Sequence, residues 1–440
     1  MNLTRALPAA IREHRLANGL EVLIAERRGD PVVAVMVWYK VGSKNERDFE
    51  SGVSHFLEHM MFKGSSRFGK GSIDRITTEL GGANNAFTSY DHTAYWFELA
   101  SDRWERALEI EADRMRTLTL DAAEYDAERA VVLEELSMGQ DDPWRVLAER
   151  VQAATIPRHP YRRPIIGFPD ALSSLAVEAM RDYYRRFYRP GNAVVIVCGD
   201  VDADEALAAV AKHFEGLPAG DEQPSPESFR PTETEPRGEQ RLSMNWDDQG
   251  KRLCMAFPTA KFASDDDATL DVISSLLTGG RLSRLHRRLV LEQALATSIS
   301  TSNDTRVEGG LFWLFAECAQ DVPPARLEAA IDAELSLLRE ELVSAKELTR
   351  VKHMLEAAEA YDHETVTDIA EDLGEHATDS HWKLAFEAIE RVKAVDAKRV
   401  RACARRFLRA DRRVLGWCLP TKAEPAQKRA KPQKKAKHRR

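Results

Sequence analysis

The sequence predicts an α+β fold in which one structural unit occurs twice, each copy an antiparallel β-sheet packed with α-helices. The same order of elements, with strands first, then helices and a closing strand, occurs in both halves of the chain. A stretch rich in Pro, Glu, Ser and Thr separates the halves at 218–237. A chain of 440 residues is also too long for one compact core. We therefore predict domains at 1–217 and 238–421, a linker at 218–237 and a basic tail at 422–440.

Strands are predicted where β-branched and aromatic residues form short apolar runs, and helices where apolar residues recur every three to four positions. In the first half this predicts strands at 20–27, 31–43, 93–100 and 192–202, and helices around 55–61, 72–80, 102–137, 144–154 and 172–187. In the second half it predicts strands at 240–248, 251–260, 309–318 and 412–420, and helices at 266–278, 282–293, 324–341 and 345–378.

Charge is distributed unevenly along the chain. Residues 422–440 contain nine Lys/Arg and one Glu, so residues 1–421 carry −16 against −8 for the whole chain. An acidic body argues against nucleic acid as the main partner, and the tail is typical of a solubilising, disordered segment.

Compartment is indicated by the cysteines and the apolar runs. The five cysteines lie far apart and show no CxxC spacing, which is typical of buried free thiols. The longest apolar runs are strand-sized, and the N-terminal residues lack the apolar core of a secretion signal. We expect a cytoplasmic protein with no membrane span, with a periplasmic location as the alternative.

The segment GVSHFLEHMMFKGS contains His55, Glu58 and His59. On a helix, His55 and His59 share one face with Cβ atoms about 6 Å apart, which lets two imidazoles bind one zinc ion. Glu58 lies beside that face, where a carboxylate can accept a proton from water without coordinating the metal. With 12 histidines, the pattern arises by chance in roughly a few per cent of such chains, so two surface histidines on an amphipathic helix are the alternative.

A catalytic zinc site needs a third protein ligand, and glutamates on one predicted helix supply candidates. Glu128 and Glu135 are two helical turns apart and share a face, which Glu124 joins, whereas Glu134 points elsewhere. For any single glutamate here, a solvent-exposed charge is the commoner explanation.

These motifs resemble the pitrilysin/insulinase-like peptidases (M16), in particular the short two-domain subfamily that includes mitochondrial processing peptidase and its bacterial relatives. The resemblance covers nearly all of residues 15–420. GSKNERDFESGVSHFLEHMMFKGS resembles the family's inverted zinc motif, HxxEH, and ERAVVLEE its distal glutamate segment, 76 positions from His59 to Glu135. The resemblance implies a metallopeptidase roll-like fold.

The resemblance also implies the roles of particular residues. One zinc ion per chain would be held by His55, His59 and Glu135. Glu58 would be the general base, and Glu128 an accessory acid. The expected activity is that of a zinc metalloendopeptidase that hydrolyses extended or unfolded peptides.

The segment GGANNAFTSYDHTAYWF resembles the family's substrate-binding edge strand, with Asn85, Ala86 and Phe87 at its centre. An exposed edge strand offers free N–H and C=O groups, so an extended peptide can add as a further strand. An ordinary hairpin turn at GGANN is the alternative.

One segment departs from the family pattern. Active members use an Arg and a Tyr from the second domain, and Val290 and Thr297 occupy those positions here. Valine has no donor, and threonine is too short to replace a phenol. We therefore expect the zinc-bearing subunit of a heterodimer whose related partner supplies the Arg/Tyr pair, with a homodimer as a second possibility. A non-catalytic scaffold or a peptide-binding subunit is the alternative function.

Overall fold

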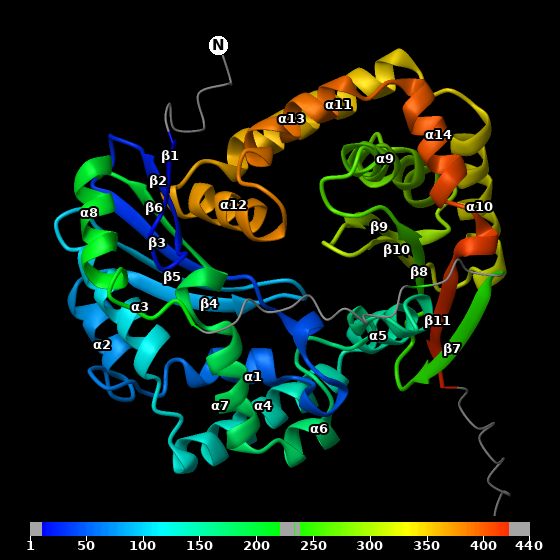
Figure 1. Ribbon diagram of the computed structural model, residues 1–440. Helices are drawn as coiled ribbons and strands as arrows, with labels where there is room; N and C mark the ends of the chain where they lie inside the picture. Colours follow the sequence, from blue (N-terminus) through cyan, green and yellow to red (C-terminus); the bar gives the residue numbers. More distant parts are fainter. Residues whose placement is uncertain (1–10, 221–232, 234–237, 422–440) are drawn as a thin grey trace, which may run out of the picture.

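A computed structural model describes residues 11–220, 233 and 238–421, and Figure 1 shows two β-sheets surrounded by helices. The first sheet contains, in spatial order, β1 (Ile11–Arg15), β2 (Glu21–Glu26), β6 (Ala193–Gly199), β3 (Val32–Tyr39), β5 (Thr93–Ala100) and β4 (Ala83–Thr88). The second contains β7 (Gln240–Trp246), β11 (Val414–Pro420), β8 (Arg252–Thr259), β10 (Gly310–Cys318) and β9 (Ala296–Asp304). The predicted α+β class with a sheet in each half is confirmed.

The sheets are mixed rather than purely antiparallel. β2 pairs with β6 in parallel, and β11 pairs with β7 in parallel, while the other neighbours are antiparallel. In each half the parallel partners lie near opposite ends of the sequence, so the intervening helices provide the long crossover that a parallel pair requires. Short apolar runs rich in β-branched and aromatic residues predicted the strands but carried no information about their direction.

Eight helices of the first half are α1 (Val53–Met60), α2 (Ser72–Glu79), α3 (Glu105–Thr117), α4 (Ala122–Gln140), α5 (Pro143–Thr155), α6 (Pro169–Ser174), α7 (Val177–Phe187) and α8 (Ala203–Phe214). The second half has α9 (Asp267–Thr278), α10 (Pro324–Glu340), α11 (Ala345–Asp362), α12 (Val366–Asp379), α13 (Leu384–Ala394) and α14 (Ala397–Phe407). The prediction omitted β1, β9, α8, α13 and α14.

The predicted single helix at 345–378 is wrong, because the chain breaks between α11 and α12. Thr365 caps α12, since its hydroxyl accepts a hydrogen bond from the Asp368 amide and the Asp368 carboxylate accepts one from the Thr365 amide. This capping box starts a new helix and lets α12 leave the direction of α11. The predicted helix at 282–293 is reduced to a π-helical segment, His286–Glu292, before Ala294 adopts a positive φ of 49°.

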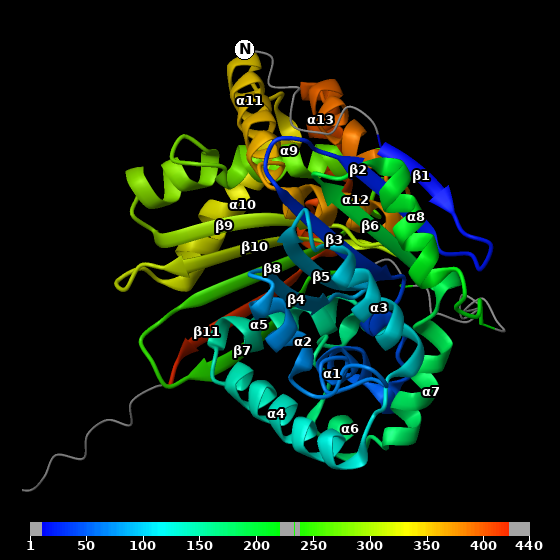
Figure 2. The ribbon, with the colours of Figure 1, turned by 90° about the vertical axis from the view of Figure 1, so that its left-hand side faces the viewer.

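One helix from each half packs on the sheet of the other half. α12 packs on the first sheet, where Ile369 and Leu373 are buried with Met36 and Trp38. α5 packs on the second sheet, where Leu147 is among the buried residues that face β8 and β11. Figures 1 and 2 show α12 against β3 and β6, and α5 beside β8 and β11. The two sheets are therefore held together by buried apolar surface as well as by the connecting chain.

The predicted domain boundaries stay predictions. Most of the linker at 218–237, namely 221–232 and 234–237, lies outside the described residues, as do 1–10 and the tail at 422–440. Among the described residues, no helix is long and apolar enough to cross a membrane.

Candidate metal centre

Helix α1 carries the histidines, and its first turn is fixed by a carboxylate a few residues earlier in the chain. Gly52 precedes the helix with a φ of 94°, and a Cβ there would lie 2.5 Å from the carbonyl oxygen of Ile166. The two carboxylate oxygens of buried Glu46 accept hydrogen bonds of 2.9 Å from the amides of Gly52 and Ser54. Glu46 thus satisfies donors that a helix N-terminus leaves unpaired, and it sets where α1 begins.

Burial raises the pKa of Glu46 from 4.5 to about 7, against the opposing hydrogen bonds from Ser54 and Gly52. Between these values the folded protein holds a proton that the unfolded chain releases, so the free energy of unfolding falls as pH rises through this window. The shift corresponds to about 3 kcal/mol. We expect this contribution to be absent in Glu46→Gln.

The contribution of Glu46 to the free energy of unfolding is measured by urea unfolding of the zinc-free wild type and of Glu46→Gln at about pH 5 and about pH 8. The stability of the wild type relative to the variant should fall with rising pH, and other titrating groups cancel in that difference. A difference that does not change with pH would contradict the expectation.

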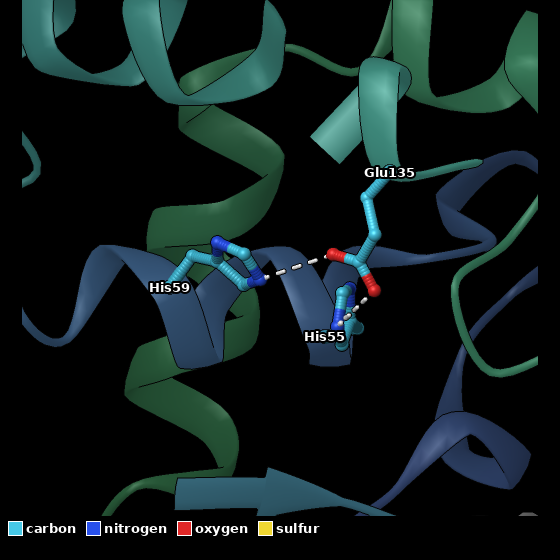
Figure 3. Close-up of side chains that lie close together, drawn as sticks. All are labelled: His55, His59 and Glu135. Carbon is cyan, nitrogen blue, oxygen red and sulfur yellow. Dashed lines mark ion pairs between the residues drawn. The ribbon is translucent and has the colours of Figure 1, made fainter. Parts of the chain in front are cut away.

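The structure brings His55, His59 and Glu135 together. Nε2 of His55 lies 3.8 Å from one carboxylate oxygen of Glu135, and Nε2 of His59 lies 3.6 Å from the other. Figure 3 shows the two imidazoles on α1 and the carboxylate reaching toward them from α4. Ligand atoms on a tetrahedral zinc ion are separated by about 3.4 Å, given metal–ligand bonds of about 2.1 Å. The donor set and its spacing therefore fit a zinc ion.

The protonation states also fit a metal ligand set. Burial lowers the pKa of His55 to about 4, helped by His59 and Arg145, so its imidazole is neutral at neutral pH. Glu135 remains 45% exposed, which leaves the site open to solvent on one side. Two imidazoles and one carboxylate, with an open position, are the arrangement of catalytic rather than structural zinc sites.

Glu128 lies behind His59, as the alignment of glutamates on one helix face predicts. Its Oε1 is 2.9 Å from Nδ1 of His59, and Nζ of Lys63 is 2.6 Å from its Oε2. Burial alone would raise the pKa of Glu128, but the hydrogen bonds from Lys63 and His59 outweigh burial and lower the pKa. A carboxylate that accepts the Nδ1 proton orients the ring, so that Nε2 faces the metal position.

Glu58 lies on the same helix as the histidines. Oγ1 of Thr88 donates a 2.6 Å hydrogen bond to its Oε2. Burial raises the pKa of Glu58 above its ordinary value, and the hydrogen bond from Thr88 opposes that rise. A carboxylate with a raised pKa is better matched to proton transfer near neutral pH than an exposed one.

The segment with Asn85, Ala86 and Phe87 forms β4, which lies at the edge of the first sheet. Asn85 is exposed, and Ala86 packs against the core that includes α1. Phe87 instead packs 5.3 Å from the Trp38 ring, on the face that α12 covers. Successive side chains alternate between faces, so Phe87 points away from the zinc-ligand helix.

Val290 and Thr297 lie in the second half, at the π-helical segment and at the start of β9. Val290 packs against the second core, and Thr297 is exposed with its hydroxyl beside Glu317. Nearby, Arg287 forms an ion pair with Glu292 and Arg288 one with Glu334.

Sequence reasoning missed three residues of the site: Glu46, Lys63 and Thr88. Glu46 and Lys63 both lie within the segment GSKNERDFESGVSHFLEHMMFKGS, and Thr88 is the last residue of the edge strand β4. A carboxylate a few residues before a glycine and a helix is a capping signal that could have identified Glu46.

Comparisons with known proteins match this chain to one peptidase family. Residues 21–168 match the model of the insulinase family (peptidase family M16), and residues 174–355 match the model described as the peptidase M16 inactive domain. The zinc protease PqqE of Helicobacter pylori is 31% identical over 81% of this chain and 80% of its own length. A probable mitochondrial-processing peptidase subunit beta of Arabidopsis thaliana is 27% identical over 89% of this chain and 75% of its own.

Solved structures share the fold. A protease from Helicobacter pylori superposes with a TM-score of 0.90 at 27% identity and covers 94% of this chain and 100% of its own. An M16-like peptidase from Alicyclobacillus acidocaldarius has a TM-score of 0.85 at 22% identity, covering 94% and 99%.

The fold and the His–His–Glu cluster place this chain among the zinc metallopeptidases. Within that class, the chain belongs to the insulinase family, peptidase family M16, and to its short two-domain group.

Proposed function

We propose that this protein is a zinc-dependent endopeptidase that cleaves extended or unfolded peptides. The observation that carries the proposal is the approach of His55, His59 and Glu135 to within 3.8 Å in imidazole–carboxylate distance. Glu58 on the same helix and the edge strand β4 supply the remaining elements of a hydrolytic site.

Each residue has a distinct role in this mechanism. His55, His59 and Glu135 would hold one zinc ion, which polarises water and the scissile carbonyl when bound. Glu58 accepts a proton from the attacking water at its carboxylate and later donates it to the nitrogen of the departing amine. Glu128 holds the Nδ1 proton of His59 and thereby keeps that ring oriented.

The substrate would bind along β4, with its backbone paired to the free edge. This mode uses main-chain groups, so it tolerates many sequences and requires an extended peptide. The side chain of Phe87 is occupied by the packing against Trp38, which leaves Asn85 and Ala86, with the strand's backbone, as the contact surface.

We further propose that the active form is a heterodimer with a related chain. The support is chemical: Val290 and Thr297 stand where the family's Arg and Tyr are expected, and neither can donate to a substrate carbonyl. The similarity to a processing peptidase subunit agrees with this proposal. A cytoplasmic location remains a prediction.

Hydrolysis of a quenched peptide mixture by the purified chain, alone and with a candidate partner, tests the function. Products should appear from internal bonds, cease with a chelator and return with zinc. Products trimmed only from peptide ends would contradict endopeptidase activity.

The second candidate function is a peptide-binding or scaffold subunit. The missing Arg/Tyr pair and the match of residues 174–355 to a domain described as inactive favour it. Binding of an extended peptide without turnover, in every mixture and with zinc bound, would replace the first proposal with this one.

A further inference from the structure

The last residue of the edge strand contacts the general base directly. Thr88 Oγ1 donates to Oε2 of Glu58 at 2.6 Å. Among the described residues, no other side chain forms a hydrogen bond with the Glu58 carboxylate. A glutamate side chain has several staggered rotamers, and this hydrogen bond favours the one that brings Oε2 to Thr88.

Thr88 is in turn fixed by the turn that follows it, Ser89–His92. The carbonyl oxygens of Ser89 and Tyr90 accept hydrogen bonds of 3.1 and 3.0 Å from the amides of Ser43 and Lys44. Gly42 permits this approach, because a Cβ there would lie 2.6 Å from both carbonyl oxygens. These contacts hold the turn against Ser43 and Lys44 and so fix the backbone position of Thr88 at the end of β4.

The second half of the chain holds the side chains of this same turn from two directions. From α12, Asp379 lies 2.9 Å from Nδ1 of His92, and both side chains are 7% exposed. From the turn between β9 and β10, the Arg306 guanidinium lies 3.7 Å from the Tyr90 ring centre. The amide of Val307 donates to Asp91 at 3.4 Å.

Buried polar groups complete the contact. The Asp91 carboxylate also accepts a 2.5 Å hydrogen bond from the hydroxyl of Tyr161, and this hydroxyl accepts one of 3.2 Å from the Glu308 amide. His159 Nε2 lies 2.8 Å from Glu308. Removing one member leaves buried partners unpaired, so this network holds a single arrangement rather than a range of them.

We propose that Thr88 is a positioning residue for Glu58, and that the second half of this chain fixes Thr88 through the turn Ser89–His92. This inference rests on the proposed function. The proposal gives the second half a role in catalysis that does not depend on the absent Arg and Tyr. Helix α12 of the second half packs on the first sheet and ends at Asp379, which contacts His92 in the turn that follows Thr88.

Thr88→Val, which removes the hydroxyl at nearly constant shape, tests the first step. Displacing a catalytic group by about 1 Å can cost about 10²-fold, so we expect kcat to fall about 10- to 100-fold. KM should change less than about 2-fold and zinc content should stay at one per chain, because Thr88 touches no metal ligand. Thr88→Ser, which keeps the hydroxyl, should restore most of kcat. Equal kcat in Thr88→Val and wild type would overturn the proposal.

The coupling to the second half is tested by a double-mutant cycle. Asp379→Ala should lower kcat about 10-fold in the wild-type background and much less in Thr88→Val, since the contact it supports is already lost. Thr367→Val is the matched control, because it removes the 2.6 Å hydrogen bond to Glu98 from the same helix without touching the turn. Equal effects of Asp379→Ala in both backgrounds would overturn the coupling.

A failure of the proposed function can be distinguished from a failure of the inference about Thr88. If the wild type shows no chelator-sensitive hydrolysis with any partner, the peptidase proposal fails while the contact remains testable. Crystal structures of wild type and Thr88→Val then decide, because a Glu58 carboxylate that keeps its position without the hydroxyl overturns the role of Thr88, and a displaced carboxylate supports it.

Discussion

Replacing Glu58 with glutamine is expected to lower kcat about 10²- to 10⁴-fold while zinc stays bound. The amide cannot accept the proton of the attacking water, yet it keeps the shape of the carboxylate and its contact with Thr88. Steady-state peptide hydrolysis, with zinc content measured on the same preparations, separates loss of chemistry from loss of metal.

Two further variants show what loss of a proposed zinc ligand and loss of an unrelated glutamate would each do. Glu135→Gln should lose both zinc and turnover, because the affected side chain is a proposed ligand. Glu134→Gln, an exposed neighbour on the same helix, should retain both. Turnover by Glu58→Gln at the wild-type rate would show that another group moves the proton, or that the activity belongs to a contaminant.

Addition of a related subunit that carries the Arg and Tyr is expected to raise kcat about 10²- to 10³-fold over the chain alone. Donors aimed at the scissile carbonyl stabilise the charge that develops there, and one such donor contributes about 2.7–4 kcal/mol. Titration of the partner at fixed concentration of this chain, with hydrolysis as the signal, gives both the gain and the stoichiometry.

The control for that experiment is the same partner with its Arg changed to Ala and its Tyr to Phe. This variant should bind equally and give little gain. Full activity of the chain alone, or an equal gain with the altered partner, would contradict the split-site proposal. Arg287 and Arg288, which both form ion pairs, would then be the candidates to replace the missing Arg.

Prediction from sequence succeeded where the chemistry is local or periodic. His55, Glu58 and His59 share one short helix, so their spacing alone fixes which of them face the same side. Helical periodicity put Glu124, Glu128 and Glu135 on one face, and the family resemblance singled out the last two. The structure places Glu128 and Glu135 beside the histidines. The residue roles themselves stay predictions until the variants are measured.

Prediction failed where partners are distant in sequence and leave no periodic pattern. The hydrogen bond from Thr88 to Glu58 and the contact of Asp379 with His92 join residues whose separation encodes nothing. The break between α11 and α12 was missed because the capping box of Thr365 and Asp368 interrupts an otherwise continuous helical pattern.

By itself, the sequence determined the α+β class, the two-part organisation and the residue types able to hold zinc, because short apolar runs, helical periodicity and ligand chemistry act over a few residues. Only the tertiary structure decided that α5 and α12 each pack on the sheet of the other half, and that Phe87 points away from the zinc-ligand helix. These outcomes depend on which apolar faces bury one another. Burial is non-directional and is resolved only when the whole chain packs.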